Sequence, residues 1–383
     1  MAQKAAKWIW QHPDYPNFVY DEGILAPLIS KIDYQRGVLD GIAKLFMQQE
    51  LEKIEIDVLT DEAVHTSLIE GEVFQRESVR SSFRKKLDKD FENTGDNKYS
   101  TAVTDSLAAV LLDCSLNKEP LSVERLHGWH NALFENNYSR LEKIRIAQFR
   151  ERDNMEVVSG AIGFEKVHYK AVPASKIEED IERFLDYCQN SADNLYIKSA
   201  IAHLWFVSIH PYDDGNGRIA RAITDYILSG SAKATRFKLY SISAAINKDR
   251  KGYYEILDRT TNLFINRNFD ITPWLVWHLN TLQNALTDAL QNIEYLVQKT
   301  KFWDAHRLQP LNERQIKVLN KLLDKGAQNF EGGLSTKKYI AMTKVSKATA
   351  VRDIAQLVLF GCIRQIEGTG GRNIRYMIDF STS

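Results

Sequence analysis

Two consecutive helices dominate the hydrophobic pattern in the middle of the chain. Residues 200–209 are apolar on nearly every face, which is typical of a helix buried inside a domain. After Gly217, apolar side chains return at helical spacing as far as Ile227, which predicts a second helix that starts near Arg218. The segment between the two is polar and rich in glycine. We therefore expect a loop that ends on a helix N-terminus.

The remaining patterns predict a short hairpin and a C-terminal region of different texture. In residues 149–173, apolar and β-prone positions (Val157, Val158, Ile162, Phe164 and Val167) accompany Gly160 and Gly163, which predicts a hairpin. In the C-terminal region, the pattern predicts an amphipathic helix at residues 315–323, a short helix at 339–342 and a turn at 343–346. A further helix at 347–358, ended by Gly361, and two alternating strands at 362–366 and 374–378 are predicted to follow.

The central loop carries groups suited to a bound phosphate, within His210–Arg221 (HPYDDGNGRIAR). Gly215 and Gly217 can take backbone conformations closed to other residues, and so let a phosphate approach the main chain closely. The free N–H groups of the following helix also favour an anion. Arg218 and Arg221 are three residues apart, on neighbouring parts of one helical face, where they can bind separate phosphates.

The same loop offers a metal-binding carboxylate and a candidate base. Asp214 is a hard oxygen ligand suited to Mg²⁺, which commonly binds through one or two carboxylates plus substrate phosphates. A histidine ordinarily titrates near neutrality, so we expect His210 to be able to take a proton from an incoming hydroxyl. Each piece alone is more simply a turn or a helix end. Their combination favours chemistry on a nucleotide phosphate.

His210–Arg221 resembles the signature of Fic-domain proteins, HPFxDGNGRxxR, and departs from it only at Tyr212, where phenylalanine is usual. The resemblance implies transfer of AMP from ATP onto a Ser, Thr or Tyr hydroxyl of a target protein. It also implies the following roles: His210 as base, Asp214 as Mg²⁺ ligand, Gly215, Asn216, Gly217 and Arg218 as phosphate cradle, and Arg221 on the γ-phosphate.

An upstream segment extends the resemblance. Residues 56–74 show helical periodicity, and within them Thr66–Gly71 (TSLIEG) resembles the family's inhibitory motif, [S/T]xxxE[G/N]. Thr66 and Glu70 are one turn apart on the same face. The implied mechanism is that Glu70 pairs with Arg221, which then cannot hold the γ-phosphate productively. The motif alone is equally an exposed glutamate before a helix-ending glycine, and its position upstream of a full signature favours the inhibitory interpretation.

Two weaker similarities concern the substrates. The predicted hairpin resembles the Fic flap, which aligns a target segment by strand addition. Tyr253, followed by Tyr254, resembles a tyrosine pair near the nucleotide base in related enzymes, so we expect Tyr253 to contact adenine or ribose. Packing in the core is the alternative for such an aromatic residue.

Charge is balanced over the chain but not along it. Basic and acidic residues both number 50, whereas residues 301–383 contain 14 basic against 7 acidic residues, a net of +7. The helix–turn–helix and strands of this region resemble the winged-helix fold, with Lys347 and Arg352 on the would-be recognition helix and Arg372 at the tip of the wing. The charge permits DNA binding, but winged helices also dock proteins or dimerise. Both partner classes stay open, as does a homodimer.

The cysteines and the hydropathy indicate a cytoplasmic protein. Cys114, Cys188 and Cys362 lie far apart, which suggests neither a disulfide framework nor a zinc site and fits a reducing compartment. No apolar run approaches the length of a membrane span, and the N-terminus lacks an apolar signal-peptide core. We expect no contact with a membrane.

These observations predict a mainly α protein: a Fic-type helical core with a short β-hairpin flap, plus a C-terminal winged-helix domain. The expected domains are an N-terminal helical cap at 1–95 with the inhibitory helix at about 56–74, a catalytic domain at 96–300 and the winged helix at 301–383. The expected function is that of an autoinhibited protein adenylyltransferase. Two alternatives stay open: removal of AMP at the same site, with Glu70 positioning water, and a DNA-binding regulator that senses nucleotide without turnover.

Overall fold

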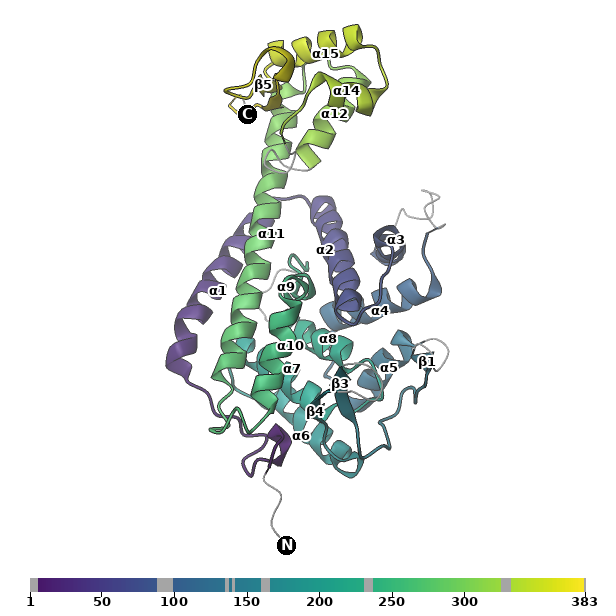
Figure 1. The fold of residues 1–383 in the computed structure, drawn as a ribbon, viewed down its shortest axis with the longest axis vertical. Helices are drawn as coiled ribbons and strands as arrows, with labels where there is room; N and C mark the ends of the chain where they lie inside the picture. The colour runs from purple at the N-terminus through teal and green to yellow at the C-terminus, as the bar shows by residue number, and fades with distance from the viewer. Residues whose placement is uncertain are drawn as a thin grey trace. The chain divides into compact units, whose positions relative to one another are not determined.

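The protein is mainly helical, as the hydrophobic pattern predicts (Figure 1). The structure is a computed structural model that describes residues 6–87, 99–134, 138–139, 142–159, 166–230, 237–324 and 332–381. No helix in these ranges combines the length and the apolar character that crossing a membrane requires. The three cysteines are buried and unpaired.

The chain forms two compact units, residues 1–289 and 290–383. Helix α11 (Thr272–His306) runs across this division, and the expected boundary at residue 301 also falls within it. The expected boundary at residue 95 lies outside the described residues. The division into three domains stays a prediction.

The first unit consists of helices and short hairpins. Its helices, before α11, are η1 Ile9–Gln11, α1 Glu22–Ala43, α2 Gln48–Ile69, α3 Arg76–Leu87, α4 Ala102–Leu116, α5 Val123–Leu133, η4 Ala174–Lys176, α6 Ile177–Asn190, α7 Leu195–Ile209, α8 Asn216–Ser229, α9 Ile242–Lys248 and α10 Arg250–Thr261. Its strands form two antiparallel pairs, β1 Tyr138–Ser139 with β2 Glu142–Lys143 and β3 Glu156–Ser159 with β4 Lys166–Lys170. The β3–β4 pair confirms the predicted hairpin, whose expected turn, with Gly160, Ile162, Gly163 and Phe164, lies outside the described residues.

Helix α7 is the centre of the first unit because its sequence is apolar on all sides. Its side chains Leu204, Phe206 and Ile209 are fully buried, and α8 packs along it. Helix α8 starts at Asn216 rather than near Arg218, since Gly215 adopts the left-handed conformation (φ 80°) and caps it. The predicted loop therefore lies inside the first unit, where it joins the buried helices α7 and α8.

Helix α2 differs from the helix predicted at 56–74. It begins earlier because Glu50 accepts a hydrogen bond from the N–H of Met47 and caps the helix start. It ends earlier because Gly71 takes a left-handed conformation (φ 84°). Gly71 donates to the Leu68 carbonyl and Glu72 to the Ser67 carbonyl, the two bonds of a Schellman motif. Residues 72–74 thus lie beyond the helix.

The second unit has its own core and the order of elements that the sequence predicts. Buried apolar side chains from its α-helices and its two strands pack together, among them Phe302, Leu319, Tyr339, Leu357 and Ile378. The elements after α11 are α12 Glu313–Asp324, α14 Thr336–Thr343, α15 Lys347–Leu359, β5 Ile363–Gln365, η5 Gly371–Asn373 and β6 Tyr376–Ile378, with β5 and β6 antiparallel. The assignment to the winged-helix fold stays a prediction.

Candidate functional site

The loop between α7 and α8 begins with a residue in an unusual conformation. His210 caps the C-terminus of α7 in the left-handed region (φ 52°), which is costly for a residue with a Cβ. Arg150 holds it there from outside the motif. Its Nε donates to the His210 carbonyl at 2.8 Å, and its backbone N–H donates to the Pro211 carbonyl at 2.9 Å. No pattern in the sequence indicated this role for Arg150.

The side chain of Asn216 fixes the shape of the loop. Its Oδ1 accepts from the Tyr212 N–H at 3.0 Å, and its Nδ2 donates to the Tyr212 carbonyl at 2.8 Å. Asn216 is also almost fully buried. Because the side-chain amide of Asn216 is already hydrogen-bonded to Tyr212, only the backbone N–H of Asn216, in the first turn of α8, remains for the expected phosphate cradle.

Helix α5 supports the loop from the opposite side. The Nδ1 of His127 lies 2.9 Å from the Tyr212 hydroxyl, which gives the tyrosine at this usually phenylalanine position a specific partner. His130 accepts from the Ala147 N–H through Nδ1, so its Nε2 carries the proton and donates to the Asp214 carbonyl at 3.2 Å. Burial lowers the pKa of His130 to about 4, so that the imidazole is neutral. Both histidines position the loop, a role that the sequence did not reveal.

His210 has the protonation state that a base requires. Burial, opposed by a hydrogen bond to Val207 and reinforced by Arg150, lowers its pKa to about 4, and the ring is therefore neutral near pH 7. Its Nδ1 lies 3.3 Å from the Val207 carbonyl, which can only accept, so Nδ1 carries the proton. The lone pair is thus on Nε2.

Both arginines of the motif are buried and hold acidic partners. Arg221 is 1% exposed, and it donates to the hydroxyl and the carbonyl of Thr66 and to Glu70 Oε1, the last at 2.7 Å. Arg218 is 7% exposed and donates to Glu72 Oε2 at 2.9 Å. The structure thus brings Glu70 and Arg221 together, and it adds Glu72, which the sequence did not single out.

Each of the two guanidinium groups also has an N–H that is buried without an acceptor in the described part of the chain: Nε of Arg218 and Nη1 of Arg221. A buried unsatisfied donor is costly, and an anionic ligand at this helix N-terminus could satisfy both of them. A Cβ on Gly217 would collide with the Glu70 carboxylate and approach Arg221 Nη1 to 3.2 Å. The Glu70 carboxylate therefore lies over the first turn of α8, where an anion would bind.

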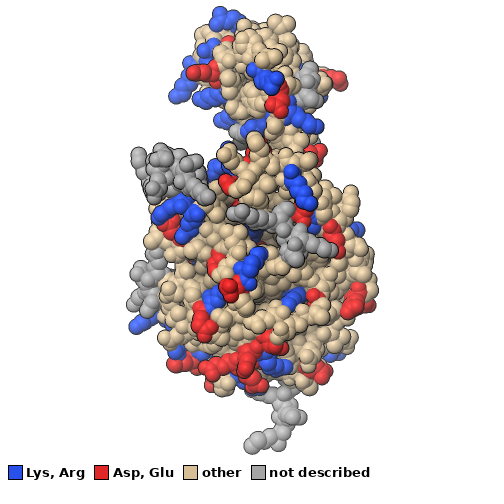
Figure 2. Space-filling view, turned by 180° about the vertical axis from the view of Figure 1, so that it is seen from behind, with Lys and Arg blue, Asp and Glu red and all other residues tan. Residues whose placement is uncertain are grey.

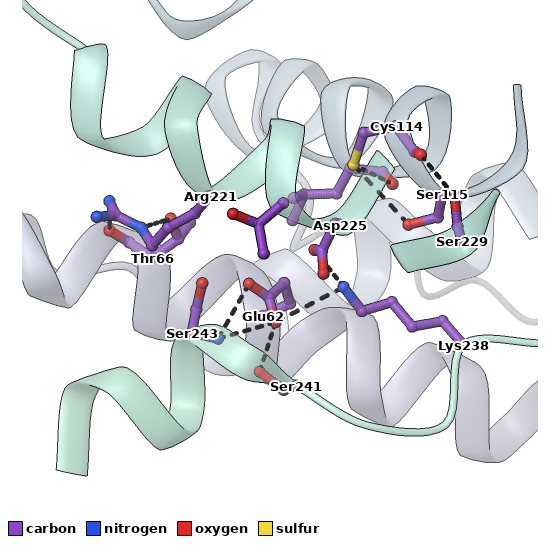
Figure 3. Close-up of polar contacts among 12 residues, drawn as sticks. Glu62, Thr66, Cys114, Ser115, Arg221, Asp225, Ser229, Lys238, Ser241 and Ser243 are labelled. Atoms are coloured by element: carbon purple, nitrogen blue, oxygen red, sulfur yellow. Dashed lines mark hydrogen bonds and ion pairs between the residues drawn. The ribbon is translucent and has the colours of Figure 1, made fainter. Parts of the chain in front are cut away.

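One helical turn further from the loop, α2 and α8 share a buried ionic cluster of Glu62, Asp225 and Lys238. Figure 3 shows the three side chains pointing toward one another, with Arg221 and Thr66 nearby. Lys238 Nζ lies 3.6 Å from Glu62 and also pairs with Asp225, and Ser241 donates to Glu62 at 2.7 Å. Burial and the neighbouring Glu62 raise the pKa of Asp225 to about 7. The cluster fastens α2 to α8 behind the site.

The Lys238→Met variant is expected to be strongly destabilised. It leaves two carboxylates buried without their common cation, and breaking a buried pair costs about 3–5 kcal/mol. Denaturant unfolding followed by tryptophan fluorescence measures the change. Lys251→Met is the matched control, because Lys251 is 89% exposed and its loss is expected to change stability little. Equal stability of the two variants would contradict the assigned role of Lys238.

Of the two neighbouring tyrosines, Tyr253 is buried and Tyr254 is exposed. Tyr253 is 2% exposed, and its hydroxyl lies 2.9 Å from Nε2 of the buried His203. Tyr254 is 42% exposed and donates to the Ile69 carbonyl at the end of α2. In this conformation Tyr253 belongs to the core, which was the alternative for it, and its contact with adenine or ribose stays a prediction.

Comparisons with known proteins agree with this arrangement. Residues 120–228, which contain α5 to most of α8 and the whole loop, match the Fic/DOC family. Residues 8–88, which contain Glu70, match a domain of unknown function, DUF4172. Residues 120–228 of this chain are thus similar to the Fic/DOC family, and the loop with His210 and both arginines lies within the matched part.

Solved structures show the same fold. A Fic family protein from Desulfovibrio desulfuricans G20 has a TM-score of 0.54 at 16% identity, over 92% of this chain and 95% of that one. A Fic domain containing signaling protein from Bacteroides thetaiotaomicron VPI-5482 has a TM-score of 0.51 at 17% identity, over 70% of this chain and 96% of that one. At such identities the likeness extends to the fold alone.

Proposed function

We propose that the protein is an autoinhibited adenylyltransferase that transfers AMP from ATP to Ser, Thr or Tyr hydroxyls of target proteins and of itself. The observation that carries the proposal is the placement of two buried, incompletely paired guanidinium groups at the N-terminus of α8. A neutral imidazole, that of His210, belongs to the same loop. Arg218 and Arg221 bind phosphates of ATP, and His210 supplies the base.

In the proposed reaction the target hydroxyl oxygen forms a bond to the α-phosphorus of ATP. The bond from that phosphorus to the bridging oxygen of pyrophosphate breaks, and pyrophosphate leaves in line with the attack. The hydroxyl proton passes to Nε2 of His210, the nitrogen that carries the lone pair. Arg218, Arg221 and the N–H groups of the first turn of α8 stabilise the charge that develops on the phosphate oxygens.

The residues present fit a Mg²⁺ ion held mainly by the substrate. Among the described residues, no group of three or more His, Cys, Asp or Glu side chains could hold a metal by itself. Asp214 offers a single carboxylate, which accepts from the Gly215 N–H at 2.6 Å, and Mg²⁺ commonly uses one carboxylate plus phosphate oxygens. Asp214 would hold the ion, which when bound neutralises phosphate charge.

The inhibitory role falls to Glu70. Its carboxylate occupies Arg221 and lies over the anion-binding turn of α8. A γ-phosphate that competes for Arg221 must displace this carboxylate, and ATP is otherwise held out of line for attack. The β3–β4 hairpin is the proposed flap, on which a target segment adds as a further strand.

Intact-mass and peptide mass spectrometry of the Glu70→Gly protein in lysate, after incubation with ATP and Mg²⁺, tests this function. We expect the mass of one AMP on target proteins and on the protein itself, and none when His210 is also changed to Ala. AMP lost from modified proteins would instead indicate the hydrolytic direction. A shift of duplex DNA without any modification would indicate a nucleotide-sensing regulator.

The rate of transfer is not expected to fall near the pH at which an ordinary histidine becomes protonated. The base must be neutral, and the pKa of His210 is lowered to about 4, chiefly by burial. The rate of the Glu70→Gly protein should therefore persist as the pH falls below the ordinary histidine value of about 6.5, and be lost only as it falls through about 4. Initial rates of self-modification across this range check it. A half-maximal rate near the ordinary value would contradict the lowered pKa.

A partner of the second unit is proposed from its charge. Lys and Arg side chains predominate on the visible face of this unit, at the top of Figure 2. Lys347 and Arg352 are exposed on α15. If they contact DNA, the Arg352→Ala variant should bind duplex DNA more weakly, and its salt dependence should be flatter. A wild-type protein without affinity for duplex DNA at low salt would favour protein docking instead.

A further inference from the structure

The turn that ends α2 presents two carboxylates to α8. Glu70 is the C-cap residue and Glu72 follows Gly71. The Schellman bonds from Gly71 to Leu68 and from Glu72 to Ser67 fix the backbone of this turn. The positions of the two acidic side chains are therefore coupled, since one rigid turn carries both.

Glu72 contacts Arg218, the arginine of the motif that is not paired with Glu70. Its Oε2 lies 2.9 Å from Nη1 of Arg218. The guanidinium of Arg218 lies over the ring of Phe134, 4.9 Å from its centroid, which holds it in one orientation. Its Nε has no acceptor among the described residues, so the group keeps a free donor beside Glu72. Arg218 is thus positioned for an anion, and one of its donors is already occupied by a carboxylate of the same chain.

We propose that Glu72 is a second inhibitory carboxylate, which acts on Arg218 as Glu70 acts on Arg221. This inference rests on the proposed function, in which Arg218 binds a phosphate of ATP. Any nucleotide that uses both arginines has to displace both carboxylates. Removal of Glu70 therefore frees one arginine only, and the Glu70→Gly protein remains partly inhibited.

The two contacts differ in strength. Arg221 is enclosed by Glu70 and two groups of Thr66, and its side chain is 1% exposed. The side chain of Glu72 is 38% exposed, so its pair with Arg218 is partly screened by water and by salt. Glu72 therefore lowers the affinity for ATP moderately, and by less at high ionic strength.

Calorimetric titration with a non-hydrolysable ATP analogue and Mg²⁺ tests the proposal. We expect Glu72→Gln to lower the Kd on the order of fivefold at low salt, in the wild-type and in the Glu70→Gly background, because an ion pair of this exposure contributes up to about 1 kcal/mol. Glu77→Gln, which removes the same charge from an exposed position in α3, is the matched control and should leave the Kd unchanged. Equal values of Kd for the two variants would overturn the proposal.

The binding experiment separates this inference from the proposed function. If Glu72→Gln binds the analogue more tightly but no variant modifies any protein, the proposed transferase function is wrong, and the competition between Glu72 and nucleotide for Arg218 is supported. If the Glu70→Gly protein transfers AMP but Glu72→Gln does not change the Kd, the transferase function is supported and the proposed role of Glu72 is wrong. Absence of nucleotide binding in every variant would overturn both. A purely structural role of Glu72 predicts a lower melting temperature with an unchanged Kd, and this outcome also counts against the proposal.

Discussion

The Glu70→Gly protein is expected to modify itself faster than the wild type, by roughly ten- to a hundredfold. The reason is that the variant frees Arg221 from a charge-assisted hydrogen bond of 2.7 Å, and such bonds contribute about 1.5–3 kcal/mol. The ATP γ-phosphate then meets no competing carboxylate at Arg221. Time courses of self-modification by intact mass, at saturating ATP, give the ratio directly.

Arg221→Ala is the decisive companion of this variant. It should lose activity because the arginine itself binds the phosphate, and adding Glu70→Gly should not restore it. Two residues of one ion pair are expected to be non-additive. Glu77→Gln again serves as the matched loss of a surface carboxylate. Equal rates for wild type and Glu70→Gly would end the autoinhibition hypothesis, and Glu70 would then be only the residue that caps α2.

His210→Ala is expected to lower the rate of transfer by about 10²- to 10⁴-fold, the usual contribution of a general base. The effect should fall on the chemical step and leave ATP binding nearly intact, because His210 is assigned no phosphate contact. Rates and the Kd of the non-hydrolysable analogue, both in the Glu70→Gly background, separate the two effects. Transfer at the parental rate would show that another group takes the proton.

The sequence predicted those features that depend on local spacing. The buried helix, the glycine loop and the amphipathic helix follow from the pattern around His210, and α7, the loop and α8 occupy those positions. Thr66 and Glu70, one turn apart, both reach Arg221 because i and i+4 side chains share a helix face. The mainly α fold with its hairpin was predictable for the same reason.

Contacts between distant segments were not predictable from one sequence. Arg150, His127 and His130 reach the loop from outside the motif, and no spacing links them to it. The sequence does not single out Glu72, because the helical periodicity continues to residue 74, whereas the left-handed Gly71 ends the helix and turns Glu72 toward Arg218. Glu62 would ordinarily count as a surface glutamate, and only the fold brings Lys238 to it.

The ionic cluster behind the site fastens the middle of α2 to α8, and it therefore bears on how the proposed inhibition can be relieved. Glu62 ties the middle of α2 to Lys238, which also pairs with Asp225 of α8, whereas Glu70 caps the helix and Glu72 lies just beyond it. Local opening of a helix end requires less free energy than opening of a buried core segment. In native-state hydrogen exchange, the amides around Gly71 should therefore exchange well before those around Glu62. In the proposed mechanism, a partner that captures the opened turn at Gly71 would draw both carboxylates away from α8 together and activate the protein while the rest of α2 stays folded.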